Sequence, residues 1–313
     1  MSLRISTAPH VHHPMTTQGL MRNVIISLLP TAAAGVYIFG LQALLTLCVA
    51  VASCVLAEFV WQKIARQPVR VGDLSAAVTG LILGLTLPST SPWWMVMIGS
   101  FFAIFIVKQL FGGLGDNFLN PALAARAVLL ASWPVHMTHY VAPTYFAQGV
   151  DAVSTATPLV NLNGLSTMDM FLGRMAGSIG EVCKAAILLG LLFLLVTGTI
   201  RWRVPIVLIG SVFVWTWILQ GSLDAALTAI LTGGVLFGAV FMATDYVTSP
   251  ITSFAQVVYA FLAGLIIVLI RLYGSYPEGV TYGILLMNIV SPLLDRFLPQ
   301  KIYGYQKKEA KQA

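Results

Sequence analysis

The residues with the clearest chemical potential lie in a short polar segment near the middle of the chain. The segment runs Asp151, Ala152, Val153, Ser154, Thr155, Ala156, Thr157 and Pro158. Side chains this small cannot form a packed core, and Pro158 biases Thr157 towards extended backbone. The Thr157 hydroxyl is therefore expected to be presented at a surface. An ordinary turn rich in serine and threonine is the alternative interpretation.

The spacing of this segment resembles the motif at which a flavin transferase joins FMN to threonine through a phosphoester bond. That motif has an aspartate, two spacer residues, a serine, a small residue, an alanine and the acceptor threonine. The chain matches it from Asp151 to Thr157, with Thr155 where many members have glycine. The resemblance implies covalent FMN on Thr157, with Asp151, Ser154, Thr155 and Ala156 as the flavinylation motif. The isoalloxazine ring would stay free to take one or two electrons.

The composition is that of an integral membrane protein. Of the 313 residues, 58% are hydrophobic and 9% are charged, whereas soluble proteins carry roughly 25% charged residues. The net charge of +6 does not indicate a nucleic-acid partner, because the basic residues lie in short loops and in the tail. The three cysteines form no CxxC pair and are interpreted as core residues, with iron-sulfur ligation as the alternative. We predict no metal site, and His10, His12 and His13 are interpreted as solvated or docked on a partner.

Ten apolar runs are candidates for membrane spans, since a crossing needs roughly 17 to 25 residues. They cover about residues 22–40, 42–64, 74–89, 92–110, 118–134, 183–200, 204–220, 224–244, 251–272 and 279–298. The third is short and rich in glycine and the fifth contains Arg126, so a broken or half-crossing segment is an alternative for either. The predicted fold is an all-α integral membrane protein of about ten transmembrane helices.

The runs divide the chain into two five-helix halves. The predicted parts are an N-terminal arm (1–21), a first membrane repeat (22–134), a loop region with the flavinylation motif (135–182), a second repeat (183–298) and a basic tail (299–313). Clusters of lysine and arginine flank alternate ends of the spans, which places both termini in the cytoplasm and Thr157 on the outer face. The first run begins too late for a cleavable signal peptide and is expected to be retained.

Two short patterns recur between the halves. Thr90–Pro92 recurs as Thr248–Pro250, and Asn117–Pro121 recurs as Asn288–Pro292. Because each half has an odd number of spans, the repeats would be inverted across the membrane. Such repeats place binding sites near the midplane, at the interface between the halves.

Ionisable residues in or beside spans are candidates for function, because burying a charge in a bilayer is unfavourable. They are Glu58, Asp73, Lys108, Arg126, Asp245, Arg271 and Asp295. Most lie near a predicted span end, where snorkelling to the interface is the alternative. Asp73 precedes a glycine-rich helix and Asp245 lies in a polar break, so these two are proposed for an ion path. No residue of the chain is expected to be catalytic by itself.

A second informative stretch, residues 112–122, combines three glycines with Asn117 and Asn120. The two amides are three residues apart and would share a face if the segment were helical. Amides can bind the edge of a flavin ring or form a hydrogen bond between helices. From spacing alone, the contact between helices is favoured.

The whole chain is similar to the RnfD/NqrB family of membrane redox subunits. The resemblance rests on five stretches, which are Pro9–His10, Asp73–Pro88, Asn117–Arg126, Asp151–Thr157 and Thr244–Pro250. It implies covalent FMN on Thr157 and non-covalent riboflavin at Asn117 and Asn120. It also implies the other Rnf subunits (A, B, C, E and G) as partners, a flavin transferase for maturation, and a bacterial cytoplasmic membrane. The chain lacks the longer N-terminal extension of NqrB, which favours the RnfD branch.

The function implied is electron transfer between ferredoxin and NAD, coupled to transport of Na⁺ or H⁺. The chain itself would not bind NAD, because it has no GxGxxG after a strand. Two alternatives remain, a solute channel of the urea-transporter type and a membrane scaffold without cofactor. Both predict no bound flavin.

Overall fold

A computed structural model of the chain describes residues 16–141, 143, 154–155, 166–274 and 279–299. The first half contains α1 (Thr17–Phe39), α2 (Leu41–Ile64), the 3-10 turn η1 (Val71–Asp73), α3 (Ser75–Thr86), α4 (Trp93–Phe101), the π-helix η2 (Phe102–Gln109) and α5 (Pro121–Ser132). The second half contains α8 (Lys184–Val196), α9 (Arg203–Gln220), α10 (Leu223–Leu231), α11 (Val235–Phe237), the π-helix η3 (Gly238–Met242), α12 (Ser253–Tyr273) and α13 (Val280–Phe297). Between them lie α6 (Pro134–Thr138), β1 (Tyr140–Val141), β2 (Ser154–Thr155) and α7 (Thr167–Leu172).

Helices occupy all ten positions expected from the apolar runs, but they differ in length. Among the described residues, α1, α2, α9 and α12 are long and apolar enough to cross a membrane, and α10 with α11–η3 adds a fifth if that bent pair is one span. In contrast, α3 and α5 have 12 residues each. At 1.5 Å per residue each is about 18 Å long, well below the roughly 30 Å of a bilayer core. The expected runs 74–89 and 118–134 were thus too long at their ends.

Local sequence explains where these short helices begin and end. The side chain of Asn120 caps α5 by accepting from the backbone N–H groups of Ala122 and Leu123, and Pro121 occupies the first helical position, where it removes no hydrogen bond. Helix α3 starts after the left-handed residue Leu74 and ends at the extended residue Leu87, which precedes a proline. Pro88 disfavours helical backbone at Leu87.

The clearest break in a span falls in the eighth run, rather than in the third or the fifth. Helices α10 and α11–η3 meet at an angle of 62°. Gly233 and Gly234 both have left-handed backbone, with φ of 64° and 69°, which glycine adopts without strain. The Arg271 guanidinium of α12 donates to the carbonyl oxygens of Ala229, Thr232 and Gly233 at 2.6 to 2.9 Å. These bonds satisfy backbone groups that the bend leaves without helical partners.

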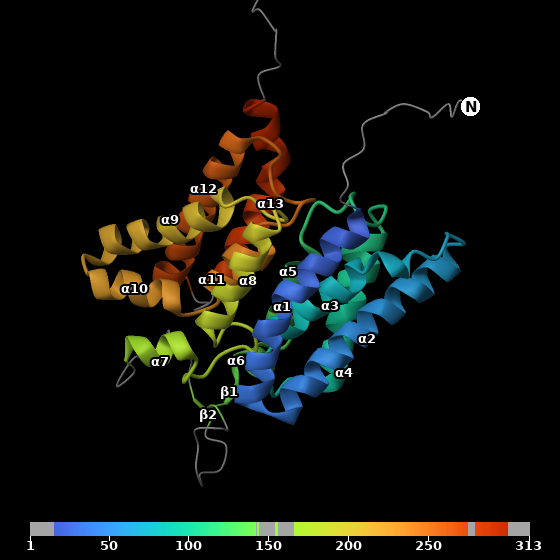
Figure 1. Cartoon of the computed structure of the whole chain (residues 1–313), viewed down its shortest axis with the longest axis horizontal. Helices are drawn as coiled ribbons and strands as arrows, with labels where there is room; N and C mark the ends of the chain where they lie inside the picture. The colour runs from blue at the N-terminus through green and yellow to red at the C-terminus, as the bar shows by residue number, and fades with distance from the viewer. Residues whose placement is uncertain (1–15, 142, 144–153, 156–165, 275–278, 300–313) are drawn as a thin grey trace, which may run out of the picture.

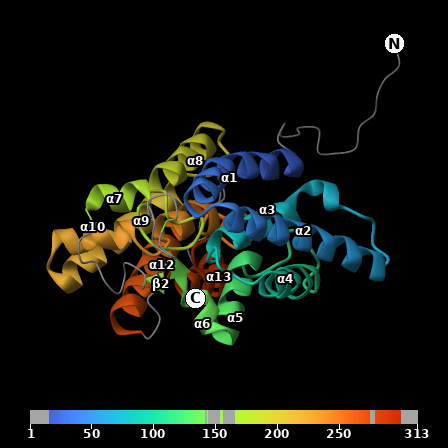
Figure 2. The ribbon, with the colours of Figure 1, turned by 90° about the horizontal axis from the view of Figure 1, so that it is seen from below.

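The two halves pack in the same pattern. Helix α2 contacts α3 and α4, and α9 contacts α10 and α12. Corresponding helices of the halves also meet, α1 with α8 and α5 with α13, and α1 lies beside α8 in both views (Figure 1 and Figure 2). The main buried cluster draws on both halves, with Leu28, Leu83, Val240 and Tyr259 among its members. The described helices therefore form one body with a shared core.

The two ends of this body differ. In Figure 1 the start of α1 and the end of α13 lie at the top, and the antiparallel ladder of β1 and β2 lies at the bottom. Tyr140 pairs with Thr155, and Val141 pairs with Ser154. The ladder joins the segment after α6 to Ser154 and Thr155, which lie in the middle of the flavinylation motif.

Candidate functional site

A pocket lies where the two halves meet, and both asparagines line it. Asn117, Asn120 and Asp245 contribute polar groups, while Val78 of α3 and Phe241 of η3 contribute apolar wall. The cavity left free between these side chains has a volume of about 80 Å³, below the roughly 300–1,000 Å³ typical of small-molecule sites. The pocket has the apolar walls and the few polar groups of a cofactor site, and its side chains would have to move apart to admit a ligand as large as a flavin.

The pocket lies at the end of the body opposite the β-ladder. Met21 and Val24, near the start of α1, line it, and that end of α1 lies away from β1 and β2 (Figure 1). The π-helices η2 and η3 both reach the pocket, through Lys108 and through Val240 and Phe241. Such π-helical turns are rare and occur often at functional sites.

Asn120 connects the halves. Its Oδ1 accepts from the backbone N–H groups of Ala122 (3.1 Å) and Leu123 (3.3 Å), while its Nδ2 donates to the carbonyl oxygen of Met242 in η3 at 3.4 Å. The contact between helices that the spacing favoured is thus present at Asn120. Asn117 precedes the helix and donates from Nδ2 to the carbonyl oxygen of Leu119 at 2.9 Å. The two amides do not share a helical face, yet both line the pocket.

The two aspartates proposed for an ion path lie in different places. Asp245 lines the pocket, and its Oδ2 accepts from the Thr248 hydroxyl at 3.1 Å. Asp73 lines a second, polar cavity, where its Oδ1 accepts from the backbone N–H and hydroxyl of Ser75 at 2.8 and 2.6 Å. Ser75 itself lines the cofactor pocket. The two carboxylates therefore belong to neighbouring cavities rather than to one site.

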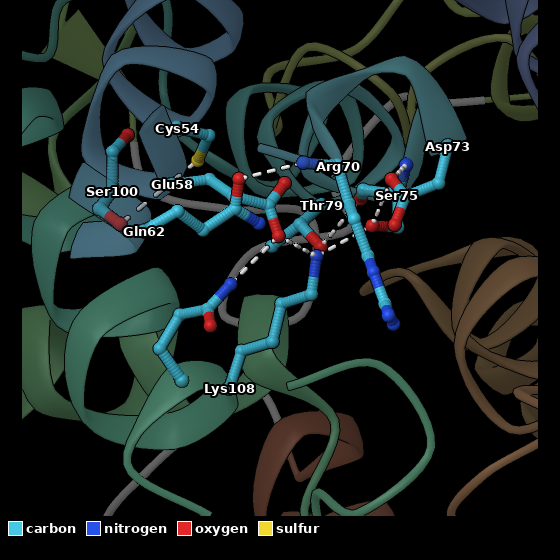
Figure 3. A network of polar contacts seen from close by, with 10 residues as sticks. Cys54, Glu58, Gln62, Arg70, Asp73, Ser75, Thr79, Ser100 and Lys108 are labelled. Carbon is cyan, nitrogen blue, oxygen red and sulfur yellow. Dashed lines mark hydrogen bonds and ion pairs between the residues drawn. The ribbon is translucent and has the colours of Figure 1, made fainter. Parts of the chain in front are cut away.

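A buried ion pair separates these two cavities (Figure 3). The Lys108 ammonium donates to Glu58 Oε1 at 2.7 Å and to the Ser75 hydroxyl at 2.5 Å, and the Gln109 amide donates to the same Glu58 oxygen at 2.7 Å. The side chains of Lys108 and Glu58 are each 2% exposed. Snorkelling, the alternative favoured for most ionisable residues, is therefore wrong for this pair. The two residues are 50 positions apart, so no local pattern could have indicated their pairing.

The remaining ionisable candidates have structural partners. Arg126 is buried at 4% exposure, which also excludes snorkelling there. Asp295 of α13 accepts from the backbone N–H groups of Ile251 and Thr252 at the start of α12. Arg271 holds the bend described above. Asp295 and Arg271 thus hold helix ends and a bend together, and none of the three residues lines the pocket.

The flavinylation motif is described only in part. Ser154 and Thr155 form strand β2. Asp151, Ala156 and Thr157 lie outside the described residues, as do His10, His12 and His13. The three cysteines are free thiols. Within the described ranges no group of three or more His, Cys, Asp or Glu side chains could hold a metal ion.

Comparison with known proteins adds independent evidence. The family described as "NQR2, RnfD, RnfE family" matches residues 4–304. The D subunit of the "Na(+)-translocating ferredoxin:NAD(+) oxidoreductase complex" of Acetobacterium woodii is 47% identical, over 99% of this chain and 99% of that protein. The D subunit of the "Proton-translocating ferredoxin:NAD(+) oxidoreductase complex" of Clostridium ljungdahlii is 41% identical, over 97% of this chain and 96% of that protein.

A more distant relative also matches along its whole length. The D subunit of the "Ion-translocating oxidoreductase complex" of Shewanella amazonensis is 37% identical, over 98% of this chain and 99% of that protein. The matches cover both halves and the segment between them. Together with the two-halved helical body and the pocket at its interface, they lead to one conclusion: the chain belongs to the NQR2, RnfD, RnfE family.

Proposed function

We propose that this chain is a membrane subunit of an ion-translocating ferredoxin:NAD⁺ oxidoreductase and carries electrons through two flavins. Relatives at 47% and 41% identity over nearly full length have names that state this activity for their complexes. The observation that carries the proposal to this chain is the pocket between the halves, with Asn117, Asn120 and Asp245 in its lining. The other subunits of the complex, A, B, C, E and G, are the proposed partners.

The pocket is the proposed site of non-covalent riboflavin. A flavin ring has an apolar face and a polar edge, and the pocket offers apolar wall at Val78, Ile82 and Phe241 together with the amides of Asn117 and Asn120. The bound flavin would supply one- and two-electron chemistry. The residues of this chain would hold it and exclude water, and Asn120 would keep η3 against α5 while doing so.

Covalent FMN is proposed on Thr157, at the opposite end of the body. Strand β2 ends at Thr155, two residues before the acceptor, and the ladder lies far from the start of α1 (Figure 1). With both termini in the cytoplasm, this end faces outwards. The two flavins would then serve opposite sides of the membrane, and the complex would couple their electron transfer to movement of Na⁺ or H⁺.

The test is in-gel fluorescence of the denatured chain, produced together with a flavin transferase. Denaturation removes riboflavin, so the remaining signal is covalent. We expect a fluorescent band that Thr157→Ala abolishes. The matched control is Thr155→Gly, which restores the residue that many motifs carry and should keep the band. If the native chain gives no fluorescent band although the transferase is active, the result would contradict the proposal and favour a solute channel of the urea-transporter type.

A further inference from the structure

The cavity on the other side of the ion pair is wide and polar. Its lining includes Glu58, Gln62, Arg70, Asp73 and Gln109, and the cavity volume is about 550 Å³. It lies at the end of α2, beside η1 and the end of η2. In the proposed orientation this is the cytoplasmic end of the body. A cavity of this size and polarity can hold water.

A continuous chain of hydrogen bonds leads from this cavity to the cofactor pocket (Figure 3). Glu58 lines the polar cavity, while Lys108 and Ser75 line the cofactor pocket. The Lys108 Nζ lies 2.7 Å from Glu58 Oε1 and 2.5 Å from Ser75 Oγ, and Ser75 Oγ lies 2.6 Å from Asp73 Oδ1. The ion pair thus links the two spaces directly.

One atom of this ion pair has no protein partner. Glu58 Oε2 is buried and makes no hydrogen bond to the described residues, although burying an unpaired carboxylate oxygen is unfavourable by roughly 1–3 kcal/mol or more. The other oxygen, Oε1, accepts from both Lys108 and Gln109. Oε2 is closed off from solvent as well as unpaired, so a water that moved in from the polar cavity lined by Glu58 would both satisfy this oxygen and bring it a proton.

The ion pair suits a proton better than a metal ion. The Lys108 ammonium lies against Glu58 Oε1 and would repel a second cation at the same carboxylate. An ammonium is a proton donor and a carboxylate is a proton acceptor, so a proton can pass between the two groups of the pair. Among the described residues, three other charged side chains lie near the pair: Asp73 is reached through Ser75, Asp245 lines the cofactor pocket with Lys108, and Arg70 lines the polar cavity with Glu58. Arg70 contributes its backbone N–H, which donates to Gln62.

We propose that Glu58 and Lys108 form a proton relay from the polar cavity to the flavin in the cofactor pocket. The proposal rests on the proposed function, because that function puts a flavin beside Lys108. A flavin held in the pocket would gain negative charge on reduction by the electrons of the ferredoxin:NAD⁺ reaction, and a proton donor of this chain would neutralise that charge. Lys108 is the proton donor on the pocket side and Glu58 the acceptor on the cavity side.

The relay consists of three proton transfers, and the number of protons and the charge are conserved over the three. The Lys108 ammonium gives one proton to a nitrogen of the reduced ring and becomes a neutral amine. Water in the polar cavity protonates Glu58 Oε2, and a half-turn about the Cγ–Cδ bond brings this oxygen to the amine. The carboxylic acid then returns a proton to Lys108. One proton has moved from the cavity to the ring, and both side chains are back in their starting states.

The test measures proton uptake with a pH indicator when dithionite reduces the flavin in the purified complex. Riboflavin content is measured first, in each sample. In Glu58→Ala we expect uptake about 100-fold slower, within the effect of a lost acid–base group, and restored by added formate or acetate that enters the polar cavity. The control is Thr46→Ala, another buried polar residue of α2, whose hydroxyl donates to the carbonyl oxygen of Gln42. It should leave uptake unchanged and insensitive to acid.

A second variant tests the relay in a chain that has no unpaired buried charge and is therefore expected to fold. Glu58→Ala leaves Lys108 without its carboxylate, which can destabilise the chain, whereas replacing both charges by apolar residues is often neutral. The double variant Glu58→Met with Lys108→Met should fold, bind riboflavin and take up protons slowly, without rescue by formate. Normal proton uptake in a riboflavin-loaded Glu58→Ala or double variant would overturn the relay. A wild-type complex without riboflavin would instead overturn the proposed function itself.

Discussion

At the scale of single residues, Asn120 has two tasks that can be separated. Its Oδ1 caps α5, and its Nδ2 reaches Met242 in the other half. Asparagine is suited to this position because its amide is acceptor and donor at once. Aspartate would keep the cap and lose the donor. Asn117, in the loop before α5, lines the same pocket without capping a helix.

We predict that these amides govern riboflavin rather than covalent FMN. Asn117→Ala should reduce non-covalent flavin, measured by extraction and chromatography, by at least about tenfold, which corresponds to about 1.4 kcal/mol. Asn120→Ala should do the same and also destabilise the chain by about 1 kcal/mol through the lost cap, whereas Asn120→Asp should keep the cap and still destabilise the chain, because it places a buried carboxylate against the carbonyl oxygen of Met242. Asn23→Ala is the control, since Asn23 bonds to Thr199 outside the pocket lining. Unchanged riboflavin in Asn117→Ala would contradict the assignment.

At the scale of elements, the bend between α10 and α11 is the least regular part of the described membrane helices. Two left-handed glycines turn the chain, and Arg271 binds three carbonyl oxygens at the turn. In a hydrocarbon environment backbone groups without partners are strongly unfavourable, so broken helices persist only where protein satisfies them. At this bend the guanidinium of Arg271, on α12, is the hydrogen-bond donor for those carbonyl oxygens.

We predict that Arg271→Met destabilises the chain by about 2 to 4 kcal/mol, because several carbonyl oxygens lose their donor. Thermal unfolding of the purified protein in detergent measures the effect. Arg271→Lys keeps the charge but presents a single ammonium instead of a planar fork, and should fall between wild type and Arg271→Met. The exposed Arg201→Met is the control and should lie within about 0.5 kcal/mol of wild type. A fully stable Arg271→Met would mean that water replaces the guanidinium.

At the scale of the whole molecule, the two halves repeat a packing pattern. Helix α2 packs with α3 and α4 as α9 packs with α10 and α12, and the pairs α1–α8 and α5–α13 join the halves. We propose that the halves are inverted repeats with ten segments in the membrane, four to five of them long spans. The pocket lies at the interface of the halves, where inverted repeats bind ligands, but towards one end of the body and not at the midplane.

This arrangement predicts the side of each loop. A cysteine introduced at Ser222, between α9 and α10, should react with a membrane-impermeant maleimide in intact spheroplasts. One at Arg201, between α8 and α9, should react only after the membrane is permeabilised, because basic loops stay in the cytoplasm. The unmodified chain, with its own three cysteines, gives the background. Equal labelling of both positions from outside would contradict a crossing by α9 and the cytoplasmic location of the basic loop before it.

The sequence by itself determined the class of protein, the positions of the helices and the candidate flavin sites. These follow from apolar runs, charge in the loops and short motifs such as Asp151–Thr157, all of which are local in the chain. Only the tertiary structure decided which distant residues meet. Lys108 pairs with Glu58, Asn120 reaches Met242 and Arg271 holds the bend at Gly233.

The physical reason lies in how buried polar groups find partners. A charge or amide inside the bilayer needs a hydrogen-bonding or charged partner. That partner can come from any helix that packs against it, and the pattern of apolar residues does not indicate which helix this is. The helix lengths could not be predicted for a similar reason. A run of apolar residues gives the greatest length that a span can have, whereas caps such as Asn120 and contacts such as that of Arg271 decide where the helix begins, ends or bends.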